Sequence, residues 1–238
     1  MIEVLFLIAF MFLIYAFFYK QTVNEYSINQ IEFTKLEKLE ELLYDKLPIV
    51  IREFPVPQCV TKDGIMSNRQ LINVLGNYLD KQDSNLPKTK EFESYMASEV
   101  GFHVYGEHVL YPRFHTNFAS EFITTFKTKL CFGSKNLQYG KAIYTAIIVI
   151  DGKYTCSLIN NEYFKGINSN WNICSDINDI KNDRTQIQFM DIILKPNTIL
   201  ILPAHWLYLM KEEIPYSYFA QFEYHEPISL LMDYLDKN

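Results

Sequence analysis

Residues 191–223 read DIILKPNTILILPAHWLYLMKEEIPYSYFAQFE, and this stretch decides the fold that the sequence predicts. Two apolar runs, residues 198–202 and 206–210, lie on either side of Pro203, and a third run, residues 216–222, follows a polar turn. Short runs that are rich in Ile, Tyr, Phe and Trp and interrupted by Pro are typical of strands rather than helices. Three such strands in succession predict an antiparallel meander.

Further strands are predicted upstream of this stretch. Residues 142–149, AIYTAIIV, form a continuous apolar run, and residues 154–159 alternate between outward and inward side chains as a returning strand would. The Asp-Gly pair within residues 150–153 predicts a hairpin turn between the two. Two more strands are expected at residues 47–54 and 186–194, the second after an Asn-rich insertion at residues 160–182 that contains Trp171.

The first half of the chain shows helical periodicity. Leucines recur at helical spacing with Glu and Lys between them, which predicts an amphipathic helix over residues 34–47. Three more helices are expected, one capped by Ser67 and continuing through Leu79, one at residues 92–100 and one at residues 117–130. Residues 55–64 are expected to be a loop and residues 101–115 an irregular aromatic segment. The predicted fold class is therefore mostly β with flanking helices (α+β).

Residues 1–19, MIEVLFLIAFMFLIYAFFY, are apolar apart from Glu3 and contain no Gly or Pro. A helix of about 18 residues is about 27 Å long, which is enough to cross the hydrocarbon core of a bilayer. A cleaved signal peptide is the alternative, but it needs a basic start and a small-residue cleavage site. The sequence therefore predicts an uncleaved transmembrane helix in contact with the lipid bilayer. Lys20 is the first charge after it, and this favours a cytosolic location for the rest of the chain.

The chain divides into three parts on this interpretation. Residues 1–20 are the transmembrane anchor, and the polar residues 21–33 are a tether. Residues 34–238 form one domain, with a helical N-terminal part at residues 34–130 and a barrel core at residues 131–226. A chain of 238 residues with 49% hydrophobic and 16% aromatic residues can bury a core of this size.

The charges and cysteines exclude several classes of function. The net charge is -6, and the 22 basic residues form no stripe of the kind that neutralises phosphates, so no nucleic-acid partner is expected. The four cysteines lie far apart without a C-x-x-C pair, so neither a disulfide framework nor a structural zinc site is predicted. Free buried thiols in a reducing compartment are expected instead.

The histidines do not form a recognisable metal-binding pattern. His103, His108 and His115 are separated by five and seven residues, whereas two imidazoles share a face at i, i+4 on a helix or at alternate residues on a strand. They are expected to be loop or core histidines. His205 is the one histidine near the Pro203–Trp206 motif, and it is expected to be a packing or surface residue.

Several motifs resemble those of one protein family. Residues 202–208, LPAHWLY, resemble the I-P-P-x-W-W-H motif of cupin-type double-stranded β-helix proteins of the JmjC-like group, and residues 47–54 resemble the segment that opens JmjC-like domains. The order of motifs over residues 142–238 is similar to that of membrane-anchored JmjC-like proteins of large DNA viruses. The resemblance implies a double-stranded β-helix, that is, a cupin or jelly-roll barrel, preceded by the transmembrane helix.

Enzymes of that family hold Fe(II) with a His-x-Asp pair and a distal His, and leave positions open for 2-oxoglutarate and oxygen. At the matching positions this chain carries Tyr139, Lys141 and Tyr208, and a lysine there would repel a cation. The position of the 2-oxoglutarate lysine carries Tyr154, with Lys153 one place earlier. The resemblance therefore implies a barrel with no catalytic residue, no metal and no cofactor. A pocket for a small apolar or sugar-like ligand and a barrel filled by side chains both remain open. The candidate pocket residues are Tyr139, Lys141, Thr145, Tyr154, Trp206 and Tyr208.

Two functions follow from the resemblance. The first is a non-catalytic, membrane-anchored JmjC-like protein, a viral structural or interaction module that binds other proteins at a virion or host membrane. The alternative is an Fe(II)- and 2-oxoglutarate-dependent oxygenase with displaced ligands, for which His103, His108, His115 or His205 would have to converge. Bound metal would distinguish the two.

Overall fold

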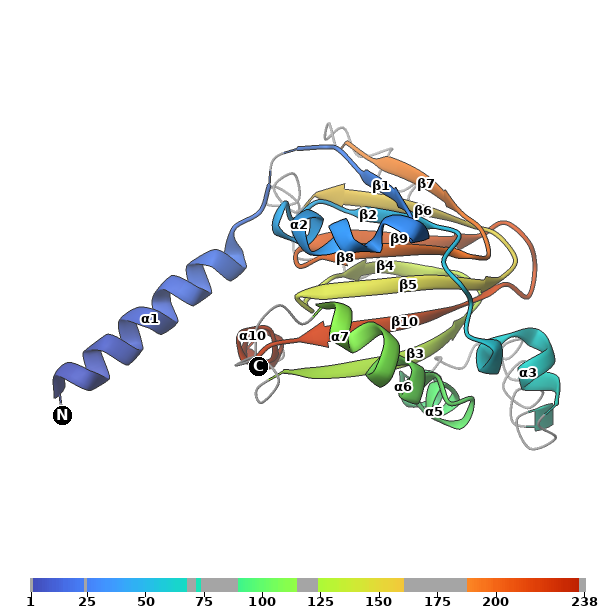
Figure 1. The fold of residues 1–238 in the computed structure, drawn as a ribbon, viewed down its shortest axis with the longest axis horizontal. Coiled ribbons are helices and arrows are strands. Elements are labelled where there is room, and N and C mark those ends of the chain that lie inside the picture. The colour runs from blue at the N-terminus through green and yellow to red at the C-terminus, as the bar shows by residue number, and fades with distance from the viewer. Residues whose placement is uncertain are drawn as a thin grey trace.

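The computed structural model describes residues 2–23, 25–67, 72–73, 90–114, 124–160 and 188–235. It is a mixed α/β structure with two sheets in which most strand pairs are antiparallel (Figure 1). Sheet A has six strands in the order β1-β2-β8-β5-β10-β3, and sheet B has four in the order β4-β9-β6-β7. The strands are β1 (Asn29–Glu32), β2 (Ile49–Arg52), β3 (Thr125–Phe132), β4 (Lys135–Tyr139), β5 (Tyr144–Asp151), β6 (Tyr154–Asn160), β7 (Met190–Leu194), β8 (Thr198–Pro203), β9 (Trp206–Glu212) and β10 (Tyr218–His225).

The three predicted strands of residues 191–223 exist as β8, β9 and β10, but the predicted meander is wrong. β8 and β10 each pair with β5 in sheet A, whereas β9 pairs with β4 and β6 in sheet B. The turn after Pro203 explains why β8 and β9 do not pair, because its backbone is hydrogen-bonded to the segment between β4 and β5. The amide of Ala204 donates to the carbonyl of Ile143, and the amide of His205 donates to that of Gly140. The turn therefore passes the chain from one sheet to the other.

The predicted Asp-Gly hairpin is also wrong, because this turn too passes the chain from one sheet to the other. β5 and β6 are both present, but they lie in different sheets and do not pair with each other. Gly152 has a φ of +85°, and a Cβ there would lie 1.8 Å from the Oγ atom of Ser217. This close approach ties the β5–β6 turn to the loop before β10. From β3 to β10, successive strands alternate between the sheets, except that β6 and β7 pair within sheet B.

Two hydrophobic clusters lie on the two faces of sheet A. One fills the space between the sheets and includes Ile147, Val149 and Phe219. The other lies between sheet A and the helices, and includes Ile148 and Phe222. The central strand β5 is therefore buried on both faces, which explains its uninterrupted apolar sequence.

One predicted helix is a strand. Phe118, Phe122 and Phe126 recur at helical spacing and predict a helix over residues 117–130, but β3 starts at Thr125 and pairs with β10 along its whole length. The competing signal is the alternation of Phe126, Thr128, Leu130 and Phe132 with two lysines, which has the period of a strand. Residues 115–123 lie outside the described residues.

The other helices differ in detail from the predictions. The expected helix over residues 34–47 is a 3₁₀ helix, Phe33–Lys38, followed by α2 (Leu39–Tyr44), and α5 (Lys90–Glu99) matches its prediction. The expected loop at residues 55–64 contains a 3₁₀ turn, Gln58–Val60, and the start of α3 (Lys62–Met66). Ser67 ends α3, and most of the helix predicted after it lies outside the described residues, as does the insertion that contains Trp171. The segment expected to be irregular is helical, with α6 (Phe102–Tyr105), a π-helical turn Gly106–Leu110 and α7 (Tyr111–Phe114).

The apolar N-terminal segment is a single helix, α1 (Ile2–Lys20), which extends away from the β-sheets (Figure 1). It is long and apolar enough to span a membrane. The polar residues after it are more than a tether, because residues 29–32 form β1, which pairs in parallel with β2. A short helix, α10 (Pro227–Leu235), follows β10 and lies beside the C-terminal half of α1.

Candidate functional site

The two sheets have an end that meets α1, which we call the anchor end. β4, β6 and β8 finish there at Tyr139, Asn160 and Pro203, and β9 starts there at Trp206. Tyr139 lies opposite Leu207, and Asn160 lies opposite Trp206. Three of the six candidate pocket residues, Tyr139, Lys141 and Trp206, are thus brought together at the anchor end.

His205 occupies the centre of the anchor end and is 8% exposed. Its backbone has a φ of +71°, in the left-handed region that non-glycine residues rarely adopt. Its Nε2 atom lies 2.9 Å from the carbonyl oxygen of Tyr19, and its Nδ1 atom lies 2.5 Å from the hydroxyl of Tyr139. A carbonyl oxygen only accepts, so Nε2 carries the proton and Nδ1 accepts from Tyr139. The histidine therefore joins the end of α1 to the end of β4.

The chain that leaves α1 covers the rest of the anchor end. Tyr19 is 7% exposed, its ring contacts the imidazole of His205 edge-on at 4.7 Å, and its hydroxyl donates to the carbonyl of Lys141 at 2.7 Å. Asn160 donates to the carbonyl of Val23, and the ring of Tyr26 meets Trp206 edge-on at 6.4 Å. Trp206 is therefore buried beneath the described residues of the segment 19–26, which we call the plug segment, whereas Tyr139 remains 38% exposed.

Lys46 forms hydrogen bonds with the backbone at the start of the plug segment. Its Nζ atom donates to the carbonyls of Phe18 and Gln21, and its own carbonyl accepts from the indole nitrogen of Trp206 at 3.4 Å. A cation at the C-terminal end of a helix satisfies carbonyls that have no partner within the helix and interacts favourably with the helix dipole. Burial lowers the pKa of the Lys46 ammonium group.

A polar network lies between the sheets, below the anchor end. The amide of Gln221 donates to the hydroxyl of Tyr208 at 3.1 Å and to Glu223 at 2.7 Å. Glu223 also forms an ion pair with Lys129 and a hydrogen bond with His225. Thr145 is 3% exposed and lies opposite Glu223 on β5. Tyr208 therefore belongs to this network, and Thr145 lies beside it on the neighbouring strand.

The network holds Glu223 in its charged form. Burial alone would raise the pKa of this carboxyl, but the hydrogen bond from His225 and the charge of Lys129 outweigh it and lower the pKa to about 2. Burial also keeps the phenol of Tyr208 neutral, because it raises its pKa well above the ordinary value. The site is thus a satisfied ion-pair network beside a neutral phenol.

Tyr154, the sixth candidate, does not join the others. It lies at the opposite end of β6, where its hydroxyl donates to the carbonyl of Gly133 at 3.3 Å and its ring meets Phe219 edge-on at 5.2 Å. Tyr154 is fully buried, so it is a core residue rather than a pocket residue.

The side chains at the positions implied for the metal do not fit Fe(II). The hydroxyl of Tyr139 forms a hydrogen bond with His205, Tyr208 is a buried neutral phenol, and Lys141 carries a positive charge. His103 and His108 are exposed on the helices outside sheet A, and His115 lies outside the described residues. Within the described ranges, no group of three His, Cys, Asp or Glu side chains is arranged to hold a metal ion.

The cysteines were expected to be free buried thiols, and this holds for two of the three that the structure describes. Cys131 and Cys156 are free and buried, and burial raises the pKa of both thiols. Cys59 is also free but exposed. Cys174 lies outside the described residues.

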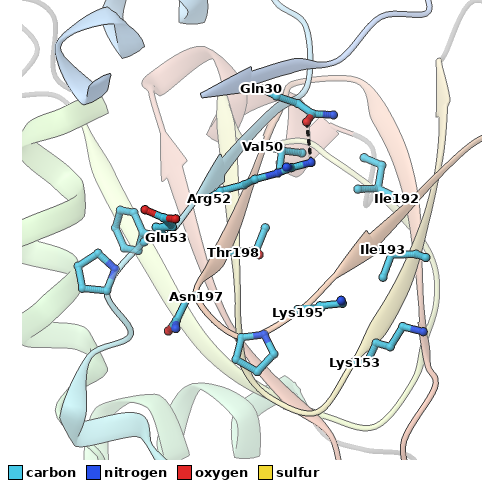
Figure 2. A pocket seen from close by; sticks show the side chains of 13 residues that line it. Gln30, Val50, Arg52, Glu53, Lys153, Ile192, Ile193, Lys195, Asn197 and Thr198 are labelled. Carbon is cyan, nitrogen blue, oxygen red and sulfur yellow. Dashed lines mark hydrogen bonds between the residues drawn. The ribbon is translucent and has the colours of Figure 1, made fainter. Parts of the chain in front are cut away.

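A hollow lies at the end of the sheets opposite the anchor end, and the sequence does not predict it. It is an open groove of about 810 Å³ between β2 and the turn that joins β7 to β8, and Figure 2 shows the side chains that line it. Arg52, Lys153 and Lys195 line it, and Glu53 is the one carboxylate among its lining residues. Arg52 donates to the side chain of Gln30 at 2.9 Å. We call this hollow the basic groove.

No protein-family model matches this sequence, and a search of curated proteins finds no match. Among solved structures, the chain is similar to the crystal structure of Drosophila melanogaster CENP-C bound to CAL1, with 6% sequence identity and a TM-score of 0.26. The similarity covers 45% of this chain and 69% of that chain. At this TM-score the similarity carries no argument about fold or function.

Proposed function

We propose that this chain is a non-catalytic, membrane-anchored protein of the JmjC-like, double-stranded β-helix type, which acts as a structural or interaction module. The observation that carries the proposal is the packing at the anchor end. There Tyr139 and His205 are hydrogen-bonded to each other, and His205 is bonded to the end of α1. Of the three positions that match the metal ligands of the resembling enzymes, Tyr139 bonds to His205 and the carbonyl of Lys141 accepts from Tyr19, which supports a role for this end in attaching α1.

The order of the strands supports the double-stranded β-helix. In such a barrel eight strands form two four-stranded sheets, and the chain crosses repeatedly between them. The adjacent strands β8-β5-β10-β3 of sheet A and the four strands of sheet B supply eight strands in this arrangement. β1 and β2 then extend one edge of sheet A.

The anchor is supported by the length and apolar composition of α1, whose side chains are mostly exposed between Val4 and Phe18. Exposed apolar residues over a whole helix are costly in water and favourable in lipid. Lys20 favours the cytosolic side for the β-sheets. The assignment to a virion or host membrane rests on the sequence resemblance to viral proteins.

The basic groove supports a role in binding other proteins. It lies at the end of the sheets opposite α1, so it faces away from the proposed membrane (Figure 1). In a chain of net charge -6, its lining combines three cations with the apolar side chains of Ile192 and Ile193. Such a lining is complementary to an acidic segment that also carries apolar residues.

Metal binding tests the proposal. The full-length chain in detergent is incubated without oxygen with Fe(II) and 2-oxoglutarate, and bound iron and the metal-to-ligand absorption band are measured. We expect no stoichiometric iron and no band. One iron per chain together with the band would overturn the proposal in favour of the alternative, an Fe(II)- and 2-oxoglutarate-dependent oxygenase. The variant His205→Asn would then show whether His205 is a ligand.

A further inference from the structure

The helix α10 lies beside the point where α1 leaves the sheets (Figure 1). The two helices are in contact, and the hydroxyl of Tyr15 donates to the carboxylate of Glu226, the residue before α10. Tyr15 is five residues before the end of α1, so it lies about 7 Å from that end along the helix axis. The start of α10 is therefore held at the level of the aromatic C-terminal end of α1.

The side chains of α10 separate into two faces. Ile228 and Ser229 are buried against the sheets, and Ser229 forms hydrogen bonds with the backbone of Glu226. Pro227, Leu231 and Tyr234 follow one another at spacings of four and three residues, so they share the opposite face. All three are exposed, Leu231 to 40% and Tyr234 to 66%. We call them the outer stripe.

The outer stripe is apolar although it faces away from the core. An amphipathic helix with an aromatic and a leucine on its exposed face suits the boundary between lipid headgroups and acyl chains. Tyrosine is particularly favourable at this depth, because its ring is apolar and its hydroxyl is polar.

We propose that α10 is an interfacial helix whose outer stripe lies on the lipid surface beside the membrane anchor. This inference rests on the proposed membrane-spanning role of α1. Its support is continuity, because the exposed apolar surface of α1 reaches Tyr15 and the outer stripe begins next to it. The chain then has two contacts with the bilayer, one that spans it and one that lies on it.

Two contacts also orient the sheets. A single spanning helix leaves the domain free to rotate about the helix axis. An interfacial contact at α10 holds the side of the domain that carries α10 against the lipid and keeps the basic groove pointing away from it. A partner in solution could then reach the groove without obstruction by the membrane.

Nitroxide spin labels test the depth of α10. The full-length chain, with Cys59 and Cys174 replaced by Ser, is placed in nanodiscs of phosphatidylcholine with a minority of phosphatidylglycerol. Single cysteines are introduced as Leu231→Cys and Tyr234→Cys for α10, and as Leu13→Cys for the middle of the anchor. Tyr216→Cys is the matched control, since Tyr216 is an aromatic residue with 82% exposure in the loop before β10, next to the distant β5–β6 turn.

Collision rates with oxygen, which concentrates in lipid, and with a water-soluble nickel chelate are compared at each label. We expect the oxygen-to-nickel ratio at Leu231 and Tyr234 to be several-fold higher than at Tyr216, and the ratio at Leu13 to be higher still. Low ratios at Leu231 and Tyr234 with a high ratio at Leu13 would overturn the interfacial helix and leave the anchor intact. A low ratio at Leu13 would overturn the anchor and, with it, this inference.

Discussion

At the scale of single residues, Glu223 is a mostly buried carboxylate whose ion pair contributes to stability. Its carboxylate is held by Lys129 and His225, and its pKa in the folded chain is about 2, below the value near 4.3 of an unfolded chain. A carboxyl whose pKa is lowered on folding stabilises the fold above its unfolded pKa and loses that effect as the pH falls toward its folded pKa.

We therefore expect Glu223→Gln to lower the free energy of unfolding at pH 7 by about 3 kcal/mol. The difference between the original chain and this variant should fall by about half by pH 3, because the original carboxyl then loses its advantage. Urea unfolding between pH 7 and pH 3 measures it. Glu41→Gln, which changes an exposed carboxylate on α2, is the control and should have little effect at any pH. A difference that stays constant with pH would show that the ion pairs do not stabilise the fold.

His205 is the residue that attaches the plug segment. His205→Asn should remain compatible with the left-handed backbone at this position, because asparagine tolerates it, but should lose the contacts with Tyr19 and Tyr139. The loss of two buried hydrogen bonds is worth about 1–2 kcal/mol, so amide exchange in residues 19–23 should become about ten times faster. Hydrogen exchange with mass spectrometry measures this. His108→Asn, on the exposed side of the outer helices, should leave the exchange of residues 19–23 unchanged.

At the scale of secondary-structure elements, the β5–β6 turn shows how the two sheets are joined. A Cβ atom on Gly152 would overlap the side chain of Ser217. Gly101 also has a positive φ, +76°, but a Cβ atom added there would have no neighbour within 4 Å. The two glycines therefore separate the cost of backbone strain from the cost of a collision.

We expect Gly101→Ala to cost about 1 kcal/mol, which is the penalty of the left-handed conformation alone. Gly152→Ala should cost about 3 kcal/mol or more, since Ser217 must also move. Thermal and urea unfolding of the two variants provide the comparison. Equal costs would mean that the contact between the turn and Ser217 is absent.

The elements also show which features the sequence can predict. Strands β5, β8 and β9 are predictable because β-branched and aromatic residues dominate short runs, which is a local property. Their pairing is not, because the Asp151-Gly152 turn carries the same local signal whether it closes a hairpin or passes the chain between sheets. The strand β3 carries two conflicting signals, because Phe122 and Phe126 satisfy the helical period while the alternation of Phe126 to Phe132 satisfies the strand period.

The candidate site is predictable to a similar extent. Of the six candidate pocket residues, the structure brings Tyr139, Lys141 and Trp206 to one end of the sheets and leaves Tyr154 at the other. Their partner Tyr19 could not be predicted, because its hydrogen bond to His205 joins residues 186 positions apart and no local pattern marks it. The basic groove could not be predicted either, because Arg52 is distant in sequence from Lys153 and Lys195 and no local pattern links them.

At the scale of the whole molecule, the plug segment makes the apolar helix α1 part of the fold. Tyr19 is buried, and residues 19–26 form hydrogen bonds or ring contacts with His205, Asn160 and Trp206. A soluble chain that begins at Ser27 lacks these contacts, whereas one that begins at Tyr19 keeps them.

The chain that begins at Tyr19 should unfold with a free energy about 2 kcal/mol larger than the chain that begins at Ser27, after the cost of ordering the extra residues. Tyr19→Ala in the longer chain should remove most of this difference. Urea unfolding of the three proteins measures it. If all three were equally stable, the plug segment would be a tether.

The strand order has a consequence for the synthesis of this protein. β10 lies between β3 and β5 and bonds to both, so sheet A remains in two pieces until the final strand has left the ribosome. The helix α1, in contrast, precedes every strand in the chain. Until β10 is made, β3 therefore has no partner in sheet A and one edge of β5 is unpaired, and unpaired strand edges favour aggregation. Its folding should accordingly depend on chaperones that protect these edges until β10 is in place.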